Sequence, residues 1–309
     1  MGERIVECVP NVSEGRDRRA VDAIAGAVRE TDGAWLLDTH VDPDHNRSVL
    51  TFAGEPEAVV QAAVRLAGHA VELIDLSRQR GVHPRLGALD VLPFVPLRGI
   101  SMEECAELAV RAGEEIWRGH RIPVYLYEHA ARRPGRRNLA DVRRPQFEGL
   151  RDAAPADASS RPDIGGPGLH PTAGAIAVAA RKILIAFNIQ LETGDISVAR
   201  RIARRIRASS GGLPAVKAMG VLLASRNLAQ VSMNLTDFEM TPPHVAFEEV
   251  SREAEREGTS VLASELVGLI PEKAVRMAGG RNLLWENLTP ASILENRLAE
   301  AVDQGRDTI

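Results

Sequence analysis

The sequence predicts an α/β protein of the α+β sandwich type, made of two tandem ferredoxin-like βαββαβ subdomains. Apolar residues recur at helical spacing in some segments and alternate in others, so both helices and strands are present. These segments follow the order βαββαβ in the first half, and the same order returns in the second half. A stretch rich in proline, glycine, serine and aspartate separates the halves.

The first half is predicted to contain one βαββαβ unit followed by a further helix and strand. Val21, Ile24 and Val28 lie at helical spacing, and Ser101 followed by Glu104 forms a capping box at a helix start. Strands are predicted at residues 3–9, 34–40, 46–54, 87–97 and 122–128, and helices at 17–31, 56–75 and 101–119.

The second half repeats the unit after a long loop at 151–174. Strands are predicted at residues 182–191, 218–225, 227–238 and 259–270, and helices at 195–209 and 243–257. One more apolar-striped helix follows residue 280. The predicted domains are therefore an N-terminal subdomain at 1–178, a C-terminal subdomain at 179–280 and a helical tail at 281–309.

The composition of the 309 residues excludes several classes of protein. With 44% apolar and 26% charged residues the chain is typical of globular proteins, and a net charge of −4 disfavours nucleic-acid binding. Two cysteines cannot make a disulfide framework. We expect no signal peptide, because charged residues stand among the first seven positions, and no membrane span, because the sequence has no apolar run of sufficient length. We expect a cytoplasmic protein.

Neutral polar side chains line one side of two predicted strands in the second half. Asn188 and Gln190 point opposite to the apolar residues of their strand, and so do Gln230 and Asn234 in theirs. A solvent-exposed face is usually rich in charged residues. Amides instead suit a site that binds, through hydrogen bonds, a ring rich in donors and acceptors. A merely polar solvent face is the alternative.

His83 is the candidate acid or base of the first half. It precedes Pro84, so it lies in extended or turn backbone, with Arg85 and Asp90 nearby. A histidine titrates near neutral pH and can move a proton in either direction. Asp90 or another carboxylate could orient its ring, and a simple turn-forming role is the alternative.

Three other features are open to more than one interpretation. The acidic and histidine-rich segment 38–45 is either a metal site or a polar hairpin turn, and Arg47 after it could reach a carboxylate. The arginine runs at 132–144 and 199–207 either capture a polyanion or form solvated faces. The loop 165–174 could wrap a ligand, but it matches no nucleotide-phosphate motif.

Seven segments, in order along the chain, resemble glutamate formiminotransferase, a folate-dependent enzyme of histidine breakdown. They are ECVPNVSEG (7–15), HNRSVLTFAG (45–54), GVHPRLGALDVLPFVPLRG (81–99), IPVYLYEHAAR (122–132), ARKILIAFNIQL (180–191), NLAQVSMNLTDFE (227–239) and SELVGLIP (264–271).

The resemblance implies two α/β subdomains with a folate tunnel between them, and it implies transfer of a formimino group from N-formimino-L-glutamate to N5 of tetrahydrofolate. By its motif, His83 corresponds to the catalytic histidine. Folate binding is assigned to Asn188, Gln190, Gln230 and Asn234 and to the loop formed by Gly165, Gly166, Pro167, Gly168, Leu169, His170, Pro171, Thr172, Ala173 and Gly174.

The resemblance also implies a homodimer that uses tetrahydrofolate as co-substrate and needs no metal. The cyclodeaminase domain fused to the mammalian enzyme has no counterpart here, so a separate cyclodeaminase is an expected partner. Three alternatives stay open: a folate enzyme of this fold with another one-carbon donor, a regulatory module that binds a small molecule without turnover, and a metal-dependent hydrolase that uses segment 38–45.

Overall fold

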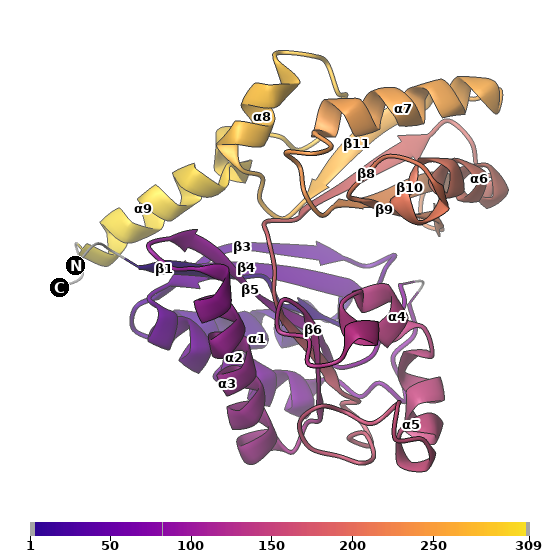
Figure 1. Ribbon diagram of the computed structural model, residues 1–309. Helices are drawn as coiled ribbons and strands as arrows, with labels where there is room; N and C mark the ends of the chain where they lie inside the picture. Colours follow the sequence, from indigo (N-terminus) through magenta and orange to yellow (C-terminus); the bar gives the residue numbers. More distant parts are fainter. Residues whose placement is uncertain (1–3, 82, 307–309) are drawn as a thin grey trace. The chain divides into compact units, whose positions relative to one another are not determined.

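Each half of the chain is built around its own β-sheet, and helices cover the sheets (Figure 1). The computed structural model describes residues 4–81 and 83–306. The first unit runs from Met1 to Arg181 and the second from Lys182 to Ile309. The expected α/β class is confirmed.

The first unit contains a seven-stranded sheet. Its strands are β1 (Ile5–Cys8), β2 (Asn11–Val12), β3 (Ala34–Asp42), β4 (Arg47–Gly54), β5 (Leu89–Arg98), β6 (Val124–Glu128) and β7 (Ile176–Ala180). Across the sheet they follow the order β3, β4, β1 with β2, β5, β7 and β6. Neighbours are antiparallel, except that β5 with β7 and β7 with β6 are parallel.

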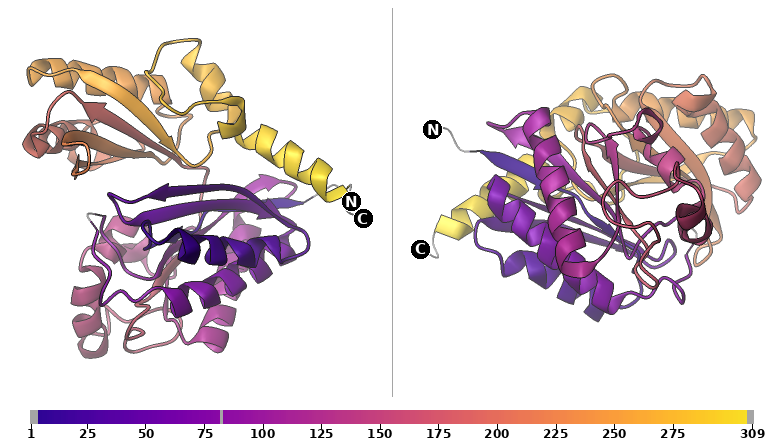
Figure 2. Two further views of the ribbon diagram at one scale, coloured as in Figure 1. Left: turned by 180° about the vertical axis from the view of Figure 1, so that it is seen from behind. Right: turned by 60° about the horizontal axis from the view of Figure 1, so that its bottom comes forward.

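Three long helices cover one face of this sheet, namely α1 (Arg18–Arg29), α2 (Pro56–Leu73) and α3 (Met102–His120) (Figure 2). Ser101 and Glu104 make the predicted capping box at the start of α3. The apolar stripes of the helices pack on the side chains of alternate strand residues, including Phe52 and Phe94. This layer is the main core of the unit.

The opposite face of β6 and β7 is covered by short helices, α4 (Leu139–Arg143) and α5 (Gln146–Ala156), after a 3₁₀ turn η1 (Pro134–Arg136). The prediction of a loop over 151–174 is wrong in its first six residues, which complete α5. Leu150 and Ala154 bury one face of this helix. Because Pro155 stands in its last turn, its missing N–H removes only one terminal hydrogen bond.

The second unit has the antiparallel strand order β11, β8, β10, β9. Its elements are β8 (Ile185–Leu191), α6 (Ile196–Ile206), η2 (Ala208–Ser210), β9 (Val216–Leu223), β10 (Leu228–Leu235), α7 (Pro243–Arg256), β11 (Val261–Val267), α8 (Glu272–Ala278), η3 (Pro290–Ser292) and α9 (Leu294–Arg306). All six elements predicted between 182 and 270 are present. Helices α6 and α7 pack on the alternating apolar side chains of β8 and β10.

Residues between α8 and α9 belong to the body of the second unit. The indole of Trp285 packs on the ring of Phe187, with ring centres 4.6 Å apart, and Ser264 donates its backbone N–H to Leu284 at 2.8 Å. Helix α9 then runs away from the sheet of this unit (Figure 1). In the described ranges, no helix is long and apolar enough to cross a membrane.

Candidate active site

Distant segments of the first unit meet at the loop that precedes β5. A side-chain carbon at Gly81 would lie 2.4 Å from the carbonyl oxygen of His45, so the loop touches the β3–β4 turn backbone to backbone. Ser13, just after β2, donates its N–H to the carbonyl of Ala88 at 2.8 Å. Ala88 in turn donates to the carbonyl of Ala173 at the end of the glycine-rich loop, at 2.9 Å.

Gly87 is the tightest point of this junction. A side-chain carbon there would lie 2.1 Å from the carbonyl oxygen of Ala175. We therefore expect Gly87→Ala to destabilise the protein by about 1–3 kcal/mol, the cost typical of overpacking. Gly119→Ala is the matched control, because nothing lies within 4 Å of that position in α3. Equal denaturation midpoints of the two variants would contradict this close approach.

His83 is half-buried in the loop before β5. Its Nδ1 lies 2.7 Å from the carbonyl oxygen of Pro84. A carbonyl only accepts hydrogen bonds, so Nδ1 carries the proton and Nε2 keeps a lone pair. The ring centre lies 6.4 Å from that of His45. His83 is thus held in the tautomer that leaves Nε2 able to accept a proton.

The surroundings keep the imidazole of His83 neutral. Burial lowers the pKa of His83 well below its usual value, and the positive charges of Arg47 and Arg143 lower it further. A neutral ring is the form that a general base needs. The electrostatics of the loop therefore suit proton abstraction at neutral pH.

Asp90 lies fully buried at the start of β5 and binds both arginines. Its Oδ2 accepts from Arg47 Nη1 at 2.8 Å and pairs with Arg143 Nη2 at 2.9 Å. Its Oδ1 accepts from the N–H of Leu86 at 2.6 Å. Burial alone would raise the pKa of Asp90, but the two guanidinium groups outweigh it and hold the pKa below its ordinary value.

We call the five residues His45, Arg47, His83, Asp90 and Arg143 the His83 cluster. The hypothesis that Asp90 orients the ring of His83 is wrong, because the orienting contact comes from the carbonyl of Pro84. Arg47 does reach a carboxylate, but it does so through one nitrogen only, in a structural salt bridge with Asp90. Arg143 was not predicted from the sequence as a site residue. One signal was available: a carboxylate in an otherwise apolar strand needs buried cationic partners.

The β3–β4 turn places His45 against Asp42. His45 Nδ1 lies 2.5 Å from Asp42 Oδ2, and the side chain of His45 is only 7% exposed. Burial alone would raise the pKa of Asp42, but hydrogen bonding from His45 lowers it below its ordinary value. The turn thus forms a polar hairpin whose histidine is fixed beside His83. Within residues 4–81 and 83–306, no three metal-ligating side chains gather in one place.

Most of the arginine run 132–144 is used inside the unit. Arg136 is buried, pairs with Asp163 at 2.5 Å and lies over the ring of Tyr125. Arg133 also reaches Asp163, and Arg144 pairs with a residue of its own helix. The polyanion-capture interpretation is therefore not supported for Arg133, Arg136 or Arg144.

The glycine-rich loop is closed by its own histidine. His170 Nδ1 accepts the N–H of Ala173 at 3.0 Å, and Gly174 adopts a left-handed conformation. The beginning of the loop lies elsewhere: a side-chain carbon at Gly165 would lie 2.5 Å from the ring of Trp117. The end of this predicted folate loop, at Ala173 and Gly174, pairs with the backbone of residues 87 and 88, which lies between His83 and β5.

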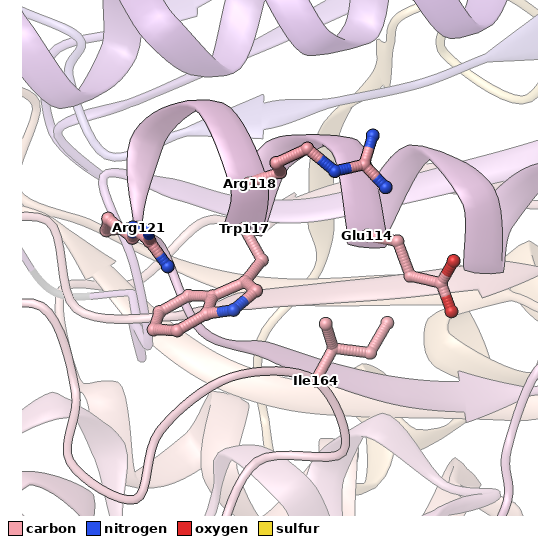
Figure 3. Close-up of a pocket in the computed structure, with 5 residues that line it drawn as sticks. All are labelled: Glu114, Trp117, Arg118, Arg121 and Ile164. Carbon is pink, nitrogen blue, oxygen red and sulfur yellow. The ribbon is translucent and has the colours of Figure 1, made fainter.

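A shallow pocket of about 350 Å³ lies between the end of α3 and Ile164 (Figure 3). Its lining consists of Glu114, Trp117, Arg118, Arg121 and Ile164. The Arg121 guanidinium lies 5.3 Å from the centre of the Trp117 ring. The pocket includes no member of the His83 cluster, and it was not predicted from the sequence.

In the second unit, the polar residues of β8 and β10 point away from the helices, as their alternation predicts. Gln230 pairs across the strands with Gln190. Asn188 and both glutamines are buried, whereas Asn234 is exposed. Among the described residues, Gln190 Oε1 and both side-chain polar atoms of Gln230 have no hydrogen-bond partner. Buried polar atoms without a hydrogen-bond partner are rare in native proteins, so these amides mark a place where a ligand, a water or an ion could bind.

Both units match the same family of known proteins. Residues 5–181 match the N-terminal subdomain of the formiminotransferase domain, and residues 186–298 match the formiminotransferase domain. The chain is 44% identical to a glutamate formimidoyltransferase of Streptococcus pyogenes, over 96% of this chain and 99% of that protein. A second glutamate formimidoyltransferase, from Thermoplasma acidophilum, is 42% identical over 97% of this chain and 99% of that protein. The formimidoyltransferase-cyclodeaminase of Mus musculus is 45% identical over 88% of this chain and 51% of its own length.

Proposed function

The chain belongs to the formiminotransferase family, and on that premise we propose that it is a glutamate formimidoyltransferase. Such an enzyme moves the formimino group of N-formimino-L-glutamate to N5 of tetrahydrofolate. The observation that carries the proposal is the agreement over nearly the whole length of two proteins of that name. This favours an enzyme over a regulatory binding module.

Tetrahydrofolate is proposed as co-substrate, and the buried amides of Gln190 and Gln230 fit it. Among the described residues, Gln190 Nε2 donates to Glu286 at 3.4 Å, whereas Gln190 Oε1 and both polar atoms of Gln230 have no partner. A pterin ring presents alternating donors and acceptors, as do the side chains of Gln190 and Gln230. Neutral groups bind such a ring without the desolvation cost of a buried charge. We assign these two glutamines and Asn188 to the pterin. Asn234 is proposed from the alternation of its strand, and the glycine-rich loop and an absence of metal are proposed from the resemblance.

His83 is proposed to act as general base and then as general acid. Tetrahydrofolate supplies the nucleophilic nitrogen N5 when it is bound. Nε2 of His83 accepts the proton that N5 loses as its bond to the formimino carbon forms, and it returns that proton to the amine of glutamate as the bond from carbon to that amine breaks. Proton and charge therefore balance over the reaction, and the neutral ring is restored.

The requirement for a neutral His83 ring predicts how kcat/KM depends on pH. Protonation of His83 removes the base, so kcat/KM should rise with pH as the ring loses its proton. Because the pKa of His83 is lowered by burial and by both arginines, this rise should lie below about pH 6.5, the ordinary value. A pH profile of kcat/KM checks this expectation. An acid limb centred at or above about 6.5 would contradict the proposed state of the ring.

The finer organisation is also a proposal. The second sheet, with order β11, β8, β10, β9 and two helices on one face, supports a ferredoxin-like unit. The order β3, β4, β1, β5 supports a second such unit, extended by β7 and β6. A folate tunnel between the units, a homodimer and a separate cyclodeaminase partner are proposed from the resemblance alone, and a cytoplasmic location is proposed from the composition of the sequence.

A donor comparison tests the proposed function. The purified protein is incubated with tetrahydrofolate and either N-formimino-L-glutamate or N-formyl-L-glutamate, and the folate product is identified by absorbance and mass. We expect 5-formiminotetrahydrofolate from the first donor and little product from the second. Product from the formyl donor alone would favour the alternative enzyme with another one-carbon donor.

A further inference from the structure

We propose that the guanidinium groups of Arg47 and Arg143 form a subsite for the α-carboxylate of the formimino donor, beside His83. This inference rests on the proposed function, and it assigns the donor to specific residues of the first unit.

The two guanidinium groups of Arg47 and Arg143 carry more positive charge than the carboxylate of Asp90 neutralises. Both bind the same oxygen of Asp90, Arg47 at 2.8 Å and Arg143 at 2.9 Å. The other oxygen of Asp90 is taken by the N–H of Leu86. Among the described residues, the carboxylate of Asp90 therefore serves both guanidinium groups, whose side chains are only 9% and 14% exposed.

Three neighbouring groups in the described part of the chain, Asp42, Glu148 and Tyr127, are not available as a second anion for these arginines. Asp42 is engaged with His45, and Glu148 binds Arg85 through both of its oxygens. Burial raises the pKa of Tyr127 to about 12, so its phenol is neutral at physiological pH. An uncompensated buried cation is costly, and a ligand carboxylate would relieve that cost.

Arg143 keeps a donor for such a ligand. In the part of the chain that the structure describes, its buried Nε has no hydrogen-bond partner. Arg47 differs, because its Nε donates to Asn11 Oδ1 at 3.1 Å. A planar guanidinium with one nitrogen on Asp90 and another free can bind a second carboxylate. Arg143 is therefore the residue on which donor binding should depend more strongly.

The chemistry of the two substrates indicates which carboxylate lies here. In formiminoglutamate the α-carboxylate and the reacting amidine nitrogen are attached to the same carbon. In tetrahydrofolate the glutamate lies beyond a benzoyl group, far from N5. A carboxylate subsite next to the base that serves the amidine therefore matches the donor.

Occupation of this subsite would also change the base itself. The groups that face His83 are Arg47 from β4, Arg143 from α4, His45 from the β3–β4 turn and the carbonyl of Pro84. A carboxylate on the arginines offsets their positive charge, so the pKa of His83 should rise when the donor is bound. His83 would then be a stronger base with substrate present than without it.

The kinetic test compares neighbouring arginines. Arg143→Gln should raise KM for formiminoglutamate by about tenfold or more, the usual cost of losing a charged hydrogen bond, with little effect on KM for tetrahydrofolate. Arg143→Lys should lie between this variant and the wild type. Arg144→Gln is the matched control, since Arg144 is 77% exposed and pairs only with Asp141 among the described residues.

Donor analogues identify the carboxylate. N-formimino-4-aminobutyrate lacks the α-carboxylate, whereas N-formiminoalanine retains it. Wild type should use the first analogue much more poorly than formiminoglutamate, and Arg143→Gln should lose that discrimination. Equal discrimination by the variant and the wild type would overturn the subsite, and so would a rise confined to KM for tetrahydrofolate.

An NMR titration keeps this inference separate from the transferase assignment, because it needs no turnover. The Cε1–H signal of His83, assigned by its loss in His83→Gln, is followed against pH with and without L-glutamate. We expect glutamate to raise the pKa of His83 in wild type and Arg144→Gln but not in Arg143→Gln. A pKa that glutamate leaves unchanged in wild type would overturn the inference. If formimino transfer is not detected but this shift occurs, the proposed function fails and the carboxylate subsite stands.

Discussion

Replacement of His83 by alanine is expected to lower turnover by about 10²- to 10⁴-fold, the usual contribution of a general base. Affinity for tetrahydrofolate should change little, because the base acts on a proton that moves in the transition state. The melting temperature should also change little, since the side chain is half-buried and its one described hydrogen bond is to the adjacent Pro84. Turnover, folate affinity and melting temperature are measured in one buffer.

A second histidine variant provides the control for this experiment. His129 follows β6 and is exposed, so His129→Ala should keep wild-type turnover. If His83→Ala retained more than about a tenth of wild-type turnover, its role as general base would have to be abandoned. Loss of stability and folate affinity together would instead indicate that His83 only shapes the loop.

Replacement of Asp90 by asparagine is expected to have the largest effect on stability. The change leaves the buried guanidinium groups of Arg47 and Arg143 without their shared carboxylate. Removing one partner of a buried ion pair typically costs about 3–5 kcal/mol. Chemical denaturation of both proteins measures this loss. Asp141→Asn, which alters only exposed contacts, the pair with Arg144 and a hydrogen bond from Asn138, should change the free energy of unfolding by about 1 kcal/mol or less.

Acid titration provides an independent check on Asp90. Its pKa is held below the ordinary value, so its contribution is complete above about pH 4, the unfolded value, and is lost as pH falls through the lower folded value. Asp90→Asn should therefore lose less stability than wild type on acidification across that range. Parallel acid denaturation curves for the two proteins would contradict the charged state of Asp90.

The sequence predicted the regular part of the fold because its signals are local. Alternation in β8 and β10 and the Ser101–Glu104 capping box each lie within a few residues. Strand β7 was missed for a physical reason. Its residues IAVAA are all buried in the middle of a sheet, so they show no alternation. Alanine is also depleted in strands, which further weakens the signal.

The site was predictable only in part. His83 could be named because its motif is local and carries the family resemblance. Arg143 could not, because its partner Asp90 lies far away in the sequence and the arginine run around it is typical of a solvated face. The orientation of the His83 ring depends on the backbone carbonyl of Pro84. Because every residue has a backbone carbonyl, the sequence does not show which one His83 contacts.

The most direct test of the central claim is the simultaneous measurement of both products in one reaction. Purified wild-type protein, tetrahydrofolate and N-formimino-L-glutamate are mixed, and glutamate release and 5-formiminotetrahydrofolate formation are followed together. We expect the two products in equal amounts, no glutamate release when tetrahydrofolate is omitted, and neither product at a comparable rate with His83→Ala. Glutamate released without tetrahydrofolate, or no formiminotetrahydrofolate from the wild type, would contradict formimino transfer by this protein.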